Sequence, residues 1–95
     1  MKPKSITNAL SIMKSRLNRL QSDTSLDETA LLPRLKSAVK ALKKNGIDLT
    51  DSADDVMLLV DYAVWRYQNR DSAEDMPKWL RLIRRERFLH TGGGA

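Results

Sequence analysis

Residues 53–69 predict a helix that is apolar on almost every side. Ser52 precedes it as a candidate N-cap, and Asp54 and Asp55 follow in the first turn, where carboxylates favour the positive end of the helix dipole. Its apolar residues are Val56, Met57, Leu58, Leu59, Val60, Tyr62, Ala63, Val64, Trp65 and Tyr67. Because a helix of this kind is buried on more than one side, we expect it at the centre of the fold, with part of its surface covered by another subunit.

Two amphipathic helices are predicted ahead of this segment. Residues 5–20 carry one apolar stripe at 3.6-residue spacing, formed by Ile6, Ala9, Leu10, Met13, Leu17 and Leu20. Ser25 and Glu28 then have the spacing of a capping box. Because proline is tolerated in the first turn of a helix but not in its interior, Pro33 predicts that the second helix begins near Ala30 or bends there.

The second and fourth helices have recognisable limits. The apolar stripe of the second helix comprises Leu31, Leu35, Ala38, Val39 and Leu42. Asn45 and Gly46 supply its C-terminal stop. The fourth helix is expected to begin with Asp75 as a cap and Pro77 at an early position. Its expected apolar side is formed by Trp79, Leu82, Ile83 and Leu89.

Length and composition indicate a single domain, residues 1–95, with 41% apolar residues for a modest core. The absence of cysteine excludes disulfides and thiolate sites. The longest apolar run, residues 56–60, is far shorter than the roughly 20 residues of a membrane span, so no membrane contact is expected. Three glycines in residues 91–95 predict a flexible C-terminal tail. The predicted fold is therefore all-α: a small bundle of four helices with a central apolar third helix.

No set of residues predicts a catalytic or metal site. His90 is the only histidine, and without cysteine a transition-metal centre would depend on carboxylates alone. Asp48, Asp51, Asp54 and Asp55 lack the mid-loop glycine and distal glutamate of a calcium-binding loop. Helix capping and solvation explain these aspartates better. We therefore expect a protein that is not an enzyme and that uses no cofactor or metal.

The formal charge of +5 hides an alternation along the chain. Residues 1–50 carry ten Lys and Arg against four Asp and Glu, residues 51–75 carry two against seven, and residues 76–95 carry five against one. Opposite-sign blocks suit contacts between neighbouring copies or with a charged partner, whereas solvated helix faces are the plain alternative.

The fourth helix carries the candidate binding residues. Arg81, Arg84 and Arg85 share one face, with Phe88 among them. The core of the protomer explains a phenylalanine on an arginine face poorly, while Arg and Phe are enriched where protein surfaces meet. We predict these four as partner-binding residues, so that Phe88→Ala weakens attachment to a partner without destabilising the protomer. In the alternative, the helix frays near Arg85 and Phe88 folds into the core.

Several segments follow one another in a characteristic order. They are Leu31-Leu32 and Leu35–Leu42 ahead of Gly46, the run Val56–Tyr67 ending in Trp65-Arg66-Tyr67, the exit Asn69-Arg70, and Met76-Pro77-Lys78-Trp79-Leu80. In pattern and order these segments resemble the head-to-tail connector (adaptor, or head completion) proteins of tailed bacteriophages. The likeness covers about two-thirds of the chain and does not include the basic N-terminal helix.

The resemblance implies a structural virion protein without enzymatic activity, assembled in the host cytoplasm and located at the head-to-tail interface. Such a protein binds the portal protein as a ring, dodecameric in this family. It extends the channel and provides a docking platform for a stopper or tail-completion protein. Genomic DNA passes through the channel without sequence-specific binding. We expect the free protein to be monomeric or weakly associating, because charged helices and one apolar side differ from the large interface of an obligate oligomer.

Two other classes fit the same sequence: a small basic DNA-binding protein that reads no sequence, and an antitoxin-like helical regulatory module. Basic residues favour the first, namely Arg81, Arg84, Arg85 and Arg87 with Lys36, Lys40 and Lys43. Against it, a nucleic-acid binder usually places its basic excess on one surface, and no helix-turn-helix with a polar recognition helix is present in the sequence. Salt discriminates the classes, because a phosphate binder loses duplex affinity steeply as salt rises.

Overall fold

The computed structural model describes residues 1–18, 27–70 and 77–90, with the side chains of 27, 28 and 88–90 excepted. These residues form four α-helices and a short π-helical turn, with no strand among them. The elements are α1 (Pro3–Arg16), η1 (Asp27–Leu31), α2 (Leu32–Lys44), α3 (Ala53–Gln68) and α4 (Lys78–His90). The all-α prediction is confirmed. The predictions at Leu20, Ser25, Asp75 and the tail 91–95 lie outside the described residues.

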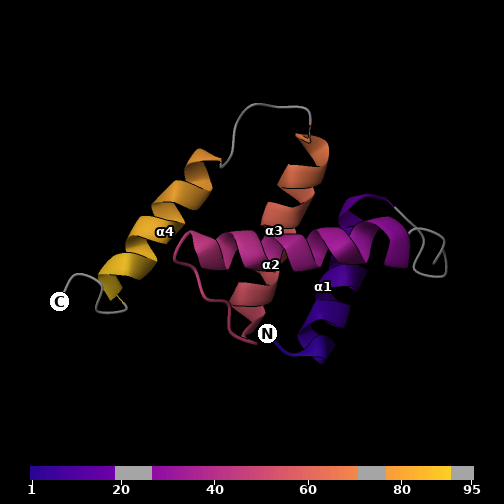
Figure 1. The fold of residues 1–95 in the computed structure, drawn as a ribbon, viewed down its shortest axis with the longest axis horizontal. Helices are drawn as coiled ribbons and strands as arrows, with labels where there is room; N and C mark the ends of the chain where they lie inside the picture. Colours follow the sequence, from indigo (N-terminus) through magenta and orange to yellow (C-terminus); the bar gives the residue numbers. More distant parts are fainter. Residues whose placement is uncertain (19–26, 71–76, 91–95) are drawn as a thin grey trace.

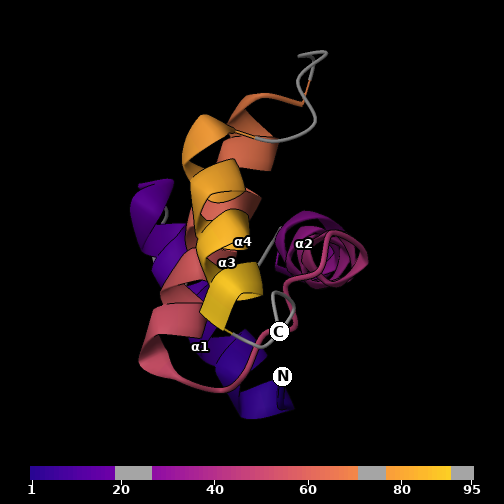
Figure 2. The same ribbon diagram turned by 90° about the vertical axis from the view of Figure 1, so that its left-hand side faces the viewer.

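The third helix, α3, lies at the centre of the bundle, as its sequence predicts. It packs against both α1 and α2. In Figure 1, α1 and α4 lie on opposite sides of α3, and α2 crosses the group. Figure 2 shows α4 running back along α3, with α2 viewed end-on beside them. None of the described helices combines the length and apolar character needed to cross a membrane.

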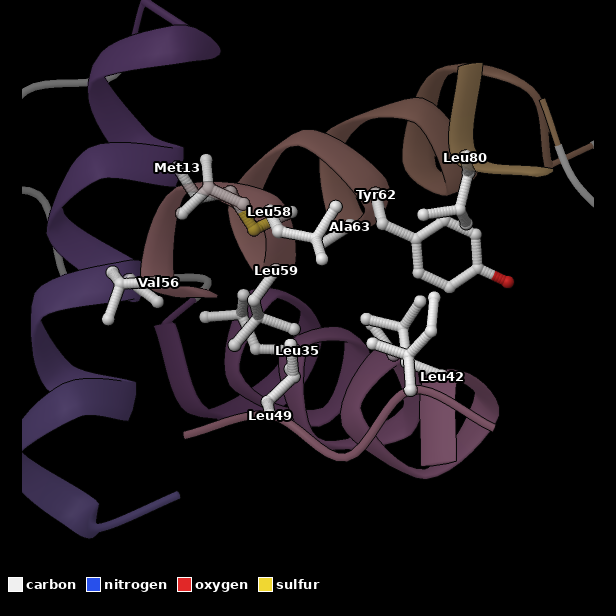
Figure 3. Close-up of a cluster of buried hydrophobic side chains, with 14 of the residues drawn as sticks. Met13, Leu35, Leu42, Leu49, Val56, Leu58, Leu59, Tyr62, Ala63 and Leu80 are labelled. Atoms are coloured by element: carbon white, nitrogen blue, oxygen red, sulfur yellow. The ribbon is translucent and has the colours of Figure 1, made fainter. Parts of the chain in front are cut away.

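The core fills the space between α3 and the helices around it. Leu59 is fully buried in the middle of α3, and the ring of Tyr62 lies between Leu42 of α2 and Leu80 of α4 (Figure 3). The predicted stripe of α2 is confirmed, with Val39 partly buried and Leu31, Leu35, Ala38 and Leu42 fully buried. From α1, Ala9 and Met13 enter the core, while Ile6, Leu10 and Leu17 pack at its edge.

The predicted stop of α2 is confirmed by its hydrogen bonds. Gly46 adopts φ +88°, a left-handed conformation that glycine adopts without a Cβ clash. Its N–H donates to the carbonyl of Lys43 at 3.0 Å, and the N–H of Ile47 donates to the carbonyl of Leu42 at 2.8 Å. This pair of bonds is a Schellman motif. Because Ile47 is also buried, the same turn leads the chain from α2 into the core.

Two predicted helix limits differ from the structure. The first helix ends at Arg16 rather than Leu20, because Asn18 turns the backbone into the left-handed region at φ 58°, which asparagine tolerates. The second helix begins at Leu32, so Pro33 occupies its first turn as expected. The π-helical turn η1 leads directly into α2. A proline without an N–H breaks the regular ladder behind it, which is consistent with this wider turn.

Candidate functional site

The face that α4 buries is not the one that its apolar pattern predicts. We expected Trp79 and Leu82 to share the core side with Ile83. Instead Leu80 is fully buried and Ile83 partly, whereas Leu82 is 67% exposed and Trp79 37% exposed. The apolar residues of this helix fall on two overlapping faces, and the fit of Leu80 against Tyr62 selects the second one (Figure 3). Trp79 and Leu82 are therefore left on the outer side of the bundle.

A buried carboxylate fastens α4 to α3. Asp55 forms an ion pair with Arg87 of α4, and its other oxygen accepts hydrogen bonds from the N–H of Thr50 at 2.7 Å and the hydroxyl of Thr50 at 2.8 Å. The N–H of Asp55 donates to the hydroxyl of Ser52 at 3.2 Å, which confirms Ser52 as the cap of α3. Burial acts to raise the pKa of Asp55, but Arg87 and Thr50 outweigh it and hold that pKa below its ordinary value.

Two further aspartates hold α1 in place. Oδ1 of Asp51 accepts hydrogen bonds from the N–H of Lys2 and the hydroxyl of Ser5, each at 2.7 Å. These bonds lower the pKa of Asp51. Asp61 of α3 pairs with Arg16 of α1 at 2.7 Å. Three aspartates of the acidic block, Asp51, Asp55 and Asp61, are therefore engaged within the chain, where they hold α1 and α4.

Low pH is expected to weaken the hydrogen bonds and the ion pair that Asp51 and Asp55 form. Because the pKa values of Asp51 and Asp55 lie below their ordinary value of 3.8 in the folded protein, the unfolded chain takes up protons first as the pH falls. Their stabilisation is therefore present above about pH 4 and is lost progressively below it. Urea denaturation of the wild type between pH 6 and 2.5 should show this loss. An Asp51→Asn/Asp55→Asn variant should show a flatter dependence, and equal slopes would contradict the assignment.

Most arginines near the centre of the bundle also have structural partners. The guanidinium of Arg66 lies 5.6 Å from the ring centre of Tyr62. Those of Arg34 and Arg70 lie 5.0 and 5.1 Å from the ring centre of Tyr67. The contact with Tyr62 accommodates Arg66, a polar break in the otherwise apolar α3.

The three arginines predicted as binding residues are brought together on one exposed face. Arg81, Arg84 and Arg85 are all exposed, and their spacing of three and four residues places them on one side of α4. Arg84 donates to the side-chain oxygen of Asn45 at 3.5 Å. Within the described part of the chain, none of the three pairs with a carboxylate. Phe88 lies in α4, but its side chain is outside the described residues, so its predicted role is untested.

These arginines border a hollow between α4 and the end of α2. The hollow has a volume of about 500 Å³. Its described lining comprises Asn45, Gly46, Arg81, Leu82, Arg84 and Arg85, and contains no carboxylate. Lys43 and Lys44 are exposed in the last turn of α2 and immediately precede Asn45 in the sequence. The sequence indicates both basic groups, but not that the Asn45-Gly46 turn at the end of α2 lies beside the three arginines of α4.

The described residues contain no group of three or more side chains suited to hold a metal ion. Of the aspartates considered for calcium, Asp51 and Asp55 are engaged in holding α1 and α4. Comparison of the chain with protein-family models, curated protein sequences and solved structures finds no match.

Proposed function

We propose that this protein is a head-to-tail connector of a tailed bacteriophage, which binds the portal as a ring and forms the platform for a stopper or tail-completion protein. The observation that carries the proposal is the outer side of α4. Leu82 is 67% exposed there, beside Trp79. Contiguous exposed apolar side chains rimmed by polar residues are typical of protein interaction sites, and Trp79 and Leu82 are neighbours on one face because they are three residues apart.

A second surface suits the ring. Asp54 and Met57 form a short stripe at helical spacing on the open side of α3, where Met57 is 37% exposed. Further along the helix, Asp61 is paired with Arg16 of α1 and Val64 packs against the core. This stripe is acidic and apolar, whereas the outer side of α4 is basic and apolar. A closed ring of identical copies requires two different surfaces that meet head to tail. The stripe on α3 and the outer side of α4 are two surfaces of this kind, which is what the proposed ring requires.

Replacing Leu82 by serine tests the proposal. Because Leu82 contributes little to the core, Leu82→Ser should leave the thermal unfolding midpoint nearly unchanged. It should reduce attachment to isolated portal rings of the same phage by at least about tenfold, the effect of losing roughly 1.4 kcal/mol of binding free energy. Co-sedimentation with portal rings and negative-stain imaging measure the attachment.

Lys36→Ser, an exposed change on α2, is the control and should attach like the wild type. If folded Leu82→Ser also attaches like the wild type, then the outer side of α4 is not the docking surface. If the wild-type protein itself does not bind the portal, the connector assignment is wrong.

A further inference from the structure

The arginines of the described residues divide into two groups. Five of them have a carboxylate or an aromatic ring as partner: Arg16, Arg34, Arg66, Arg70 and Arg87. The other three, Arg81, Arg84 and Arg85, have no such partner and all line the same hollow. Guanidinium groups of this kind present a fork of donors that matches phosphate and carboxylate oxygens. The hollow therefore presents donors of the kind that bind anions.

Lysines extend the positive charge beyond the hollow. Lys40, Lys43 and Lys44 are exposed on the last turns of α2, and the Asn45-Gly46 turn that follows them forms part of the lining. Basic side chains are thus exposed both on α4 and on the last turns of α2, the helix whose terminal turn borders the hollow. A single carboxylate would not require a surface of this extent, whereas a polymer with regularly spaced charges would. Leu82 is the only apolar side chain in the described lining, and the rest of that lining is polar or basic apart from Gly46.

Folding also removes the strongest argument against nucleic-acid binding. In the sequence, the basic segments alternate with an acidic block, whereas a nucleic-acid binder usually gathers its basic excess on one surface. In the structure, Asp51, Asp55 and Asp61 are engaged with α1 and α4. Arg81, Arg84 and Arg85, which line the hollow, have no carboxylate partner among the described residues.

We propose that this hollow binds the phosphodiester backbone of duplex DNA, independently of base sequence. Arg81 and Arg85 are four residues apart, or about 6 Å along α4. One DNA strand places about two phosphates over that length. Contacts to the phosphates hold DNA without reading its sequence. This activity goes beyond portal docking and is tested in the absence of a portal.

The test is fluorescence anisotropy with a short random-sequence duplex, measured in full-length protein from about 50 to 200 mM salt. For the wild type, the logarithm of the association constant should fall linearly with the logarithm of the salt concentration. Arg81→Gln/Arg85→Gln should lower the affinity by about tenfold or more at 0.1 M salt, and should reduce the steepness of the plot by about 1.8, since each phosphate contact contributes about 0.9. Circular dichroism melting should show that the variant stays folded, because both side chains are exposed.

A matched control removes two positive charges from another part of the surface. Lys2→Gln/Lys4→Gln changes two exposed lysines at the start of α1, and should leave the slope of the plot nearly unchanged. Equal weakening by both double variants, or no duplex binding by the wild type at 50 mM salt, would overturn the proposal. The proposal would also be overturned if polyglutamate competed with the labelled duplex as strongly as unlabelled DNA of the same total charge. Loss of portal attachment with unchanged duplex affinity in Arg81→Gln/Arg85→Gln would assign the arginines to the protein partner instead.

Discussion

Replacing Leu59 by alanine should lower the free energy of unfolding by about 2–5 kcal/mol. Leu59 is fully buried in the middle of α3, the helix against which both α1 and α2 pack. The change removes apolar burial and leaves a cavity that helices on several sides would have to close. For a domain of this size, such a loss is a large part of the total stability. Urea denaturation followed by circular dichroism measures it.

The matched control is the same substitution at Leu82. Because Leu82 is 67% exposed, Leu82→Ala should change the free energy of unfolding by no more than about 0.5 kcal/mol. A comparable loss in both variants would mean that the outer side of α4 is covered in solution by another part of the chain or by another copy. Concentration dependence of the Leu82→Ala loss would distinguish these two explanations.

Features that depend on neighbouring residues could be predicted from the sequence. The stop at Gly46 and the cap at Ser52 are set by backbone groups within a few positions, and both are confirmed. The central position of α3 was also predictable, because a helix without a polar side has few places in a small fold. In each case the signal lies in the chemistry of one short segment.

The orientation of α4 depends on residues far away in the sequence. Its apolar residues at 79, 80, 82 and 83 fit two helix faces equally well by spacing alone. Which face is buried depends on Tyr62 and on the pairing of Asp55 with Arg87, 32 residues later. An aspartate at the third position after Ser52 signals a capping role, but nothing in its own segment identifies Arg87 as the partner.

The candidate site likewise depends on contacts between residues that are far apart in the sequence. In the sequence, the three arginines of α4 are one basic group and the lysines of α2 another. In the structure, the three arginines line a hollow whose other described lining includes Asn45 and Gly46, which directly follow the lysines of α2. Arginines with structural partners could not be separated from the others in advance, because the partner aromatic rings and aspartates belong to other helices.

Breaking the ion pair between Asp55 and Arg87, which fixes α4, should also have a large effect on the free energy of unfolding. Arg87→Gln should lower the free energy of unfolding by about 3 kcal/mol, since it leaves the carboxylate of Asp55 with only the hydrogen bonds from Thr50. The side chain of Asp55 is 5% exposed and that of Arg87 30% exposed, so water replaces the lost partner poorly. Urea denaturation gives the total loss, and amide hydrogen exchange should show that α4 loses protection first.

Arg16→Gln is the matched control, because it removes one arginine from an ion pair of different burial. The side chains of Arg16 and Asp61 are 42% and 39% exposed, so their pair should contribute about 1 kcal/mol or less. Adding Asp55→Asn to Arg87→Gln should recover part of the loss, because the buried charge is then removed as well. If Arg16→Gln and Arg87→Gln have equal effects, then Asp55 is hydrated in solution. In that case Leu80 and Ile83, rather than the ion pair, hold the basic face of α4 beside the end of α2.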